Sequence, residues 1–269
     1  MSKADAVALV QSFATSPAEP DDWPGISRNK LATELIERIR NPDCIRQGGT
    51  SLCGPASFIR AVAIDMPVTY ARCAMDLYRT GKGNIVGLDI APHRRMRRTP
   101  PMYTTAADWI MLGSVRDDEN VIFSVASKPG AVAGMTLPRA MVKWFKSAGY
   151  RNVSEQAHIA WWPIQTRLAT ARYASNLYSG GYKVAMLIDA DILNADKRFV
   201  DKVNVPNHWV TLISPIFKSP NVKLEDPISL EVYSWGGKVP VPDSSKGSEG
   251  WVPLRLFLQK FYGFVAAKL

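Results

Sequence analysis

The sequence has few cysteines and few histidines. Among its 269 residues there are three of each. Three thiols cannot form a disulfide framework, and no pair of cysteines, or of cysteine and histidine, has the spacing of zinc ligands. These absences exclude the small secreted folds that depend on disulfides and argue against a zinc site. We therefore predict a reducing compartment and no metal or other cofactor.

Long apolar runs are also missing. None approaches the roughly 18 residues that suggest a membrane span, and residues 1–10 lack the apolar core of a Sec-type signal peptide. We expect no membrane span and a cytoplasmic location in the producing cell, with any export following a route that needs no cleaved signal. Internal repeats, low-complexity tracts and linkers that would force a domain boundary are absent from the sequence as well.

Positive charge exceeds negative charge. The chain has 33 Lys and Arg against 24 Asp and Glu, a formal net charge of +9. Such a surface attracts nucleic acid, anionic lipid or an acidic protein. The densest basic run, residues 93–98, lacks interleaved aromatics or a nucleic-acid motif. A solvated loop is the preferred interpretation of this run, an anionic partner is the alternative, and nucleic acid is not an expected partner.

Helical patterns precede strand patterns along the chain. We expect helices over residues 4–15, 30–40, 53–64, 67–80, 106–112, 136–149 and 164–178, with a long loop over 82–105. We expect strands over residues 120–125, 182–190, 209–213, 230–233 and 264–267. Helices followed by strands predict an α+β fold with an antiparallel sheet. Residues 1–40 are expected to form an N-terminal helical extension and residues 41–269 a single domain.

The most informative segment surrounds Cys53. A glutamine, Gln47, stands six residues before this cysteine, and Gly54 and Pro55 after it favour a turn into a helix. The start of a helix presents unpaired N–H groups and a partial positive charge, which favour a thiolate over a thiol. We predict that Cys53 begins a helix and acts as a nucleophile. Cys44 and Cys73 lack this setting and are interpreted as structural.

A cysteine nucleophile needs a general base. Of the three histidines, His93 lies in the basic run and His158 precedes a tryptophan pair, whereas His208 stands at the start of a β-rich segment. A strand can hold an imidazole at fixed geometry. We predict that His208 is the base, although a histidine in isolation is more often structural.

The imidazole in turn needs an acceptor for its second nitrogen. Asp226 follows His208 by 18 residues, and two antiparallel strands joined by the intervening loop would set the two side by side. Glu225 and Asn207 are alternatives, and an Asp-Pro pair is also a common turn former. Trp235 follows the next strand and could shield the His–acid pair from water, with packing in the core as the other interpretation.

Together these features resemble the papain-like cysteine peptidase superfamily. The resemblance rests on residues 45–60 and 180–240, in particular Gln47, Cys53-Gly54 at a helix start, His208 at a strand start, and Ser234-Trp235-Gly236. The run His208-Trp209-Val210 followed by Asp226-Pro227 is similar to the bacteriocin-processing peptidases associated with ABC transporters and to related secreted toxins. Tyr233 stands where the family's Asn-Ser-Trp motif has asparagine, so Asp226 is the preferred orienting residue.

The resemblance implies a papain-like fold, in which the nucleophile helix of the N-terminal half packs on an antiparallel sheet of the C-terminal half. It also implies roles. Cys53 would attack a carbonyl, His208 would move the proton and Asp226 would fix the imidazole tautomer. The side-chain amide of Gln47 and the backbone N–H of Cys53 would form the oxyanion hole.

The expected function is that of a cysteine protease or amidase with a protein or peptide substrate. A delivered bacterial effector or toxin is the favoured setting, with a cognate inhibitor or immunity protein as a candidate partner. A glutamine deamidase or a transglutaminase-like enzyme is the first alternative, because it uses the same thioester chemistry. A catalytically silent papain-like binding module is the second.

Overall fold

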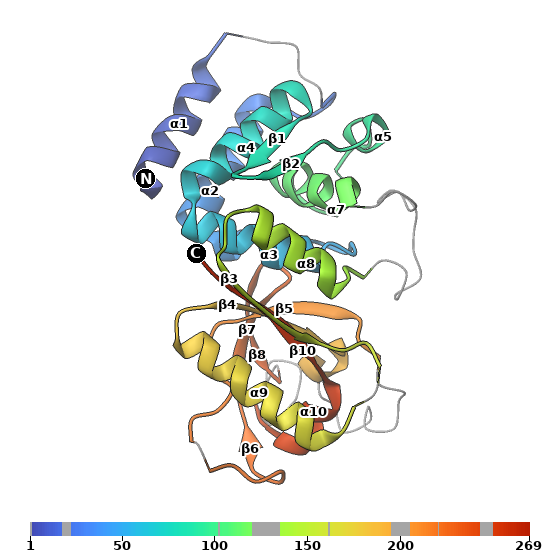
Figure 1. The fold of residues 1–269 in the computed structure, drawn as a ribbon. Coiled ribbons are helices and arrows are strands. Elements are labelled where there is room, and N and C mark those ends of the chain that lie inside the picture. The colour runs from blue at the N-terminus through green and yellow to red at the C-terminus, as the bar shows by residue number, and fades with distance from the viewer. Residues whose placement is uncertain are drawn as a thin grey trace. The chain divides into compact units, whose positions relative to one another are not determined.

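The computed structural model describes residues 2–17, 23–101, 103–119, 135–160, 162–194, 205–219, 221–242 and 250–269. The chain forms two compact units (Figure 1). The first comprises Met1–Gly149 together with Trp235–Gly237, and the second comprises Tyr150–Ser234 and Lys238–Leu269. The expected strand at residues 120–125 lies outside the described residues.

The first unit is helical. In chain order its elements are α1 (Lys3–Thr15), α2 (Arg28–Arg40), the 3-10 turn η1 (Pro42–Cys44), α3 (Cys53–Asp65), α4 (Pro67–Thr80), β1 (Gly83–Ile85), β2 (Leu88–Ile90), α5 (Arg94–Arg97), α6 (Ala106–Asp108), the π-helical η2 (Trp109–Gly113), α7 (Ser114–Glu119) and α8 (Pro138–Ser147). Helix α3 is buried on every side from Cys53 to Ala63. Its Phe58 ring packs on Trp144 and Phe145 of α8, at 5.7 and 5.3 Å between centroids.

Local signals explain the ends of these helices. A capping box joins Ser2 and Asp5 at the start of α1. Pro67 occupies the first turn of α4, and Gly81 ends that helix in the left-handed conformation with φ 69°. The prediction of a helix over residues 67–80 that stops at Gly81 is therefore confirmed.

The second unit is a six-stranded antiparallel sheet covered by two helices. Its elements are β3 (Asn152–Ala157), α9 (Ile164–Ser179), β4 (Lys183–Ile188), the 3-10 turn η3 (Ala190–Asn194), β5 (His208–Leu212), β6 (Pro227–Ile228), β7 (Leu230–Ser234), β8 (Gly237–Val241), β9 (Val252–Pro253), α10 (Leu254–Lys260) and β10 (Phe261–Lys268). The strand order is β3-β10-β4-β5-β7-β8, and β6 pairs with β9 separately.

The core of the second unit lies between the sheet and its helices. Ala171 and Ala174 of α9 and Phe257 of α10 share one buried cluster with Met186 of β4 and Val210 of β5. Alanines on the inner face of α9 let the helix approach the strands closely, while long aliphatic side chains of the sheet fill the layer. Strand β5 is central in this sheet, and all five of its residues are buried.

The α+β class and the antiparallel sheet are confirmed, whereas the papain-like arrangement stays a prediction. The long loop expected over residues 82–105 is wrong, because the segment contains the hairpin β1–β2 and the helix α5. Each strand of that hairpin has only three residues, so alternation could not show in the sequence. Its apolar residues Ile85, Leu88 and Ile90 are nevertheless buried. Helix α1 packs on α2 and α4, and a domain boundary at residue 40 stays a prediction.

Candidate active-site residues

Cys53 is the first residue of α3, as the sequence predicts, and its side chain is buried. Leu52 precedes it as the cap, and the N–H of Ala56 donates to the Leu52 carbonyl at 2.9 Å. A Cβ on the next residue, Gly54, would come within 2.4–2.8 Å of the Thr136 side chain. Glycine at this position therefore lets the first turn of α3 pack directly against Thr136.

Gln47 lies in a closed turn ahead of α3. Its side-chain Nε2 donates to the Thr50 carbonyl at 3.2 Å, and the Thr50 hydroxyl donates back to the Gln47 carbonyl at 2.5 Å. Gly48 has φ 62°, and a Cβ there would overlap the Tyr103 carbonyl oxygen. The turn thus fixes the Gln47 amide, which carries a second N–H that does not serve the bond to Thr50.

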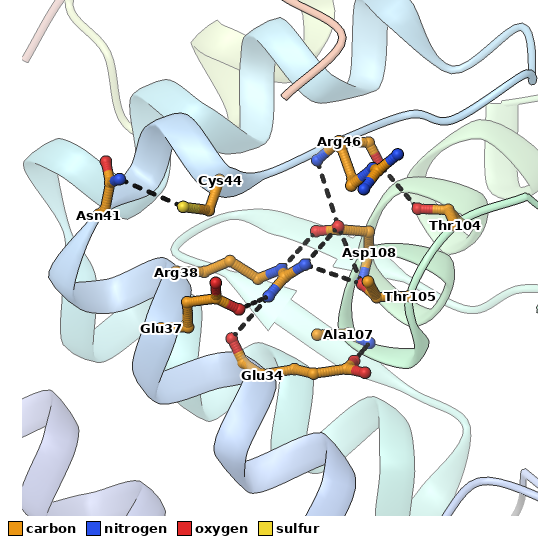
Figure 2. Close-up of polar contacts among 10 residues, drawn as sticks. All are labelled: Glu34, Glu37, Arg38, Asn41, Cys44, Arg46, Thr104, Thr105, Ala107 and Asp108. Atoms are coloured by element: carbon orange, nitrogen blue, oxygen red, sulfur yellow. Dashed lines mark hydrogen bonds and ion pairs between the residues drawn. The ribbon is translucent and has the colours of Figure 1, made fainter. Parts of the chain in front are cut away.

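A buried ion pair joins Arg38 of α2 to Asp108 of α6 (Figure 2). The guanidinium of Arg38 donates to both carboxylate oxygens of Asp108, from Nε and Nη2, at 2.8 Å each. The Thr105 hydroxyl donates to Asp108 at 2.9 Å. Burial alone would lower the pKa of Arg38, but the hydrogen bond and negative charge of Asp108 outweigh it and raise that pKa. Arg38 is therefore charged throughout the ordinary pH range.

The same carboxylate holds the chain next to Gln47. Asp108 Oδ2 accepts the backbone N–H of Arg46 at 3.2 Å, and the Thr104 hydroxyl donates to the Arg46 carbonyl at 2.6 Å (Figure 2). Arg46 is thus bonded at both of its peptide groups. The sequence gives no sign of this support, because Arg38 and Asp108 are 70 residues apart.

The other two cysteines, unlike Cys53, do not begin a helix. Cys73 is fully buried inside α4, and this burial raises the pKa of its thiol. Burial, and next the negative charge of Glu37, also raise the pKa of Cys44, whose sulfur accepts a hydrogen bond from Asn41 at 3.2 Å. Neither environment favours a thiolate. Their interpretation as structural cysteines stays a prediction.

His208 is the first residue of β5 and is buried. Its ring nitrogen Nε2 lies 2.7 Å from the hydroxyl oxygen of Ser234. Burial lowers the pKa of His208 to about 4, so the imidazole is neutral at pH 7. A neutral imidazole has one donor and one acceptor nitrogen, and the contact with Ser234 fixes its orientation.

Ser234 ends β7, the strand beside β5. Thr211 pairs with Tyr233, so in this antiparallel register the next residue of β7, Ser234, lies opposite Val210. His208 is two residues before Val210 on β5, so Ser234 and His208 are diagonal neighbours on the same face of the sheet. In the sequence, Ser234 is notable only as part of the run Ser234-Trp235-Gly236, and nothing there predicts its contact with His208. Its contact with His208 depends on strand register, which the sequence did not supply.

Asp226 is not brought together with His208. Its carboxylate accepts the backbone N–H of Lys223 at 2.8 Å, as in an ordinary turn. The strand that pairs with β5 is β7, and its first residue, Leu230, lies at the Leu212 end of β5. Residues before Leu230 are therefore at the end of the strand pair opposite to His208. The expectation that the two residues lie side by side is wrong, because Asp226 precedes the first residue of the pairing strand and therefore lies beyond the end of the strand pair that is far from His208.

The alternatives to Asp226 have other partners. Asn207 accepts the backbone N–H of Ala190 at 2.8 Å through its side-chain oxygen. Glu225 forms an exposed ion pair with Arg255 at 2.9 Å. Ser234, in contrast to these residues, contacts the His208 ring directly.

Trp235 and Gly236 form the two-residue turn of the β7–β8 hairpin. Their φ angles are 49° and 87°, both in the left-handed region that such turns require. That conformation suits glycine and is strained for a bulky tryptophan. The turn belongs to the first unit, where a Cβ on Gly236 would lie 2.5 Å from Cβ of Arg46. Trp235 is 39% exposed, and its predicted shielding role stays a prediction.

The basic run lies on the short helix α5 rather than in a loop. His93 precedes the helix, and both its backbone N–H and its Nδ1 contact Asp117, at 2.7 and 3.0 Å. Met96 is buried, whereas Arg94 and Arg95 are exposed. Within the described residues no cluster of three His, Cys, Asp or Glu side chains could hold a metal ion. No described helix has the length and apolar character that crossing a membrane requires.

No protein-family model matches this chain, and neither a curated protein nor a solved structure gives a match. The likeness to papain-like peptidases therefore rests on the residues of this sequence alone. Within each unit those residues have defined surroundings: Cys53 and Gln47 in the first, His208 and Ser234 in the second.

Proposed function

We propose that this protein is a cysteine hydrolase of the papain-like type that cleaves amide bonds in a protein or peptide substrate. The observation that carries the proposal is the start of α3. Cys53 stands at the N-terminus of a buried thirteen-residue helix, directly after a turn that fixes the Gln47 amide. This position stabilises a thiolate, and the neighbouring amide is a donor suited to an oxyanion.

The general base in this proposal is His208. Support comes from the fixed orientation of its ring, since a base must be aimed at the proton that it takes. Because Nε2 of His208 is bonded to Ser234, the proposal assigns to Nδ1 the exchange of protons with the Cys53 thiol and the leaving amine. Ser234 replaces Asp226 as the orienting residue. A hydroxyl carries no charge, so Ser234 orients the ring without the stabilisation of imidazolium that a carboxylate would add.

The proposed reaction has two halves. His208 takes the proton from the Cys53 thiol, and the sulfur attacks the substrate carbonyl carbon to give a tetrahedral oxyanion. Its C–N bond then breaks as the imidazolium returns the proton to the leaving amine, which leaves a thioester on Cys53. Water, deprotonated by His208, attacks the thioester and releases the acid and the free thiol. The Gln47 amide and the Cys53 N–H would stabilise both oxyanions.

The proposal predicts that Cys53 is the most reactive thiol of the chain. Iodoacetamide at pH 7 should alkylate Cys53 at least about tenfold faster than Cys44 or Cys73, with sites and rates read by peptide mass spectrometry. His208→Gln should slow labelling of Cys53 by about tenfold or more, and Ser234→Ala by a smaller factor. His158→Gln is the matched control and should leave the rate unchanged. Equal rates at the three cysteines, unaffected by His208→Gln, would refute the proposal.

A second candidate is a binding module without catalysis. The observation that favours it is burial, since Cys53 and His208 are only 4% and 5% exposed.

A protease and a deamidase are separated by mass spectrometry of a treated protein mixture. New peptide termini indicate proteolysis, whereas a shift of about one dalton without cleavage indicates deamidation. A Cys53→Ala variant that keeps full biological activity would favour the binding module.

A further inference from the structure

The second unit contains a cavity that the proposed hydrolase chemistry does not use. It lies between helix α9 and the segment that follows β5, and its volume is about 490 Å³. Its lining residues are Arg172, Ser175, Asn176, Ser179, Phe217, Lys218 and Ser219. This volume falls within the range typical of sites for small organic molecules.

Most of the side chains around this cavity can donate hydrogen bonds. Arg172, Asn176 and Ser179 follow one another on successive turns of the same face of α9, and Lys218 with Ser219 come from the opposite wall. None of the lining residues has a carboxylate. Within the described part of the chain, Arg172 and Lys218 form no ion pair. Two unpaired cations flanked by hydroxyl and amide donors are the chemistry that recognises a dianion.

The walls of the cavity are held together by Ser175. Its hydroxyl oxygen is buried and accepts the backbone N–H groups of Ile216 and Phe217, at 3.1 and 3.3 Å. Ile216 also packs into the core of the unit. The segment that carries Phe217 and Lys218 is therefore anchored to α9. An anchored wall lowers the entropy cost of binding a ligand.

We propose that this cavity binds a small phosphate-bearing molecule. Arg172 and Lys218 hold the phosphoryl oxygens, Ser179 and Ser219 supply hydroxyl donors, and the Phe217 ring contacts the organic part of the ligand. The proposal is independent of the hydrolase chemistry. A phosphoryl group fits better than a carboxylate because its three oxygens can be shared among donors on both walls.

The test uses the full-length protein, with inorganic phosphate and phenyl phosphate as probes at constant ionic strength. Amide NMR shifts should saturate for residues of α9 and of the segment around Phe217. The double variant Arg172→Gln/Lys218→Gln should weaken phenyl phosphate binding by about tenfold or more. Phe217→Leu should weaken phenyl phosphate several-fold, by about a factor of three to ten, without changing the affinity for inorganic phosphate.

The matched control is Arg151→Gln/Lys223→Gln, which removes the same charge from exposed positions of the same unit outside the cavity lining. This control should keep its affinity within about twofold. Equal weakening in the two double variants would mean diffuse attraction to a basic protein and would overturn the proposal. Co-sedimentation with vesicles that carry a phosphomonoester headgroup, without saturable binding of phenyl phosphate, would overturn the small-molecule assignment in favour of a lipid surface.

Discussion

His208 joins the proposed chemistry to the stability of the second unit. Its imidazole is buried, and Nε2 bonds to Ser234. Burial disfavours the charged form, which is why the pKa of His208 falls from 6.5 to about 4. The same burial that keeps the imidazole neutral at neutral pH makes its charged form costly in the folded protein.

The lowered pKa makes the folded state sensitive to acid. Below pH 6.5 the unfolded chain binds a proton at His208 that the folded chain does not take up until about pH 4. The stability present above pH 6.5 is therefore lost as the pH falls toward 4, by roughly 3 kcal/mol at most. Urea unfolding of the wild-type protein and of His208→Gln at several pH values measures this loss, which should be smaller in the variant.

His158→Gln serves as the control for that experiment. His158 is exposed, and its ring packs against that of Trp162 in a tilted arrangement at 4.4 Å between centroids. The variant should keep the wild-type dependence of unfolding free energy on pH between 4 and 6.5. If His208→Gln also keeps it, the imidazole of His208 is not buried in its neutral form.

At the scale of elements, the start of α3 depends on a support from outside the helix. The Arg38–Asp108 pair of α2 and α6 holds Arg46, and Arg46 leads into the turn that contains Gln47. Both members of the pair are at most 2% exposed. Removing one partner from such a pair leaves an uncompensated buried charge.

Asp108→Asn should therefore lower the free energy of unfolding by about 3–5 kcal/mol. The double variant Arg38→Met/Asp108→Leu should lose less than the sum of the single variants, because neither charge is then stranded. Urea denaturation followed by circular dichroism measures both. Glu37→Gln is the control: Glu37 also contacts Arg38 but is 60% exposed, so its loss should cost less than about 1 kcal/mol. A small effect for Asp108→Asn would show that the pair does not support this region.

At the scale of the whole molecule, the chain leaves and re-enters the second unit at the β7–β8 turn. Trp235–Gly237 belongs to the first unit, while Ser234 before it and Lys238 after it belong to the second. Glycine is needed at position 236 because a Cβ there would overlap the side chain of Arg46. The residue that contacts His208 is thus covalently next to a turn that packs in the other unit.

Gly236→Ala should disturb this turn. Alanine at φ 87° is strained, and its Cβ would overlap Cβ of Arg46, so we expect a loss of about 2–4 kcal/mol in unfolding free energy. Hydrogen exchange should show faster amides in both the 45–47 segment and β7. Gly237→Ala is the control, since a Cβ there has no neighbour within 4 Å. Equal exchange in the two variants would contradict the role of the turn.

Helix ends and one catalytic candidate were predictable because their signals are local. Gly81 stops α4 through its own backbone freedom, and Cys53 begins α3 because Gly54 and Pro55 follow it. The β1–β2 hairpin could not be predicted, since three residues are too few to show alternation. The partner of His208 was missed because register was unknown.

By itself the sequence determined the α+β class, the helix that begins at Cys53 and the strand predicted over residues 209–213 that His208 leads into, because helix caps and hydrophobic periodicity act over a few residues. Only the tertiary structure decided that Ser234 rather than Asp226 contacts His208, that Asp108 holds Arg46, and that Arg172 and Lys218 share a cavity. Each of these pairs is far apart in the chain. Their meeting depends on strand pairing and helix packing, which no local pattern specifies.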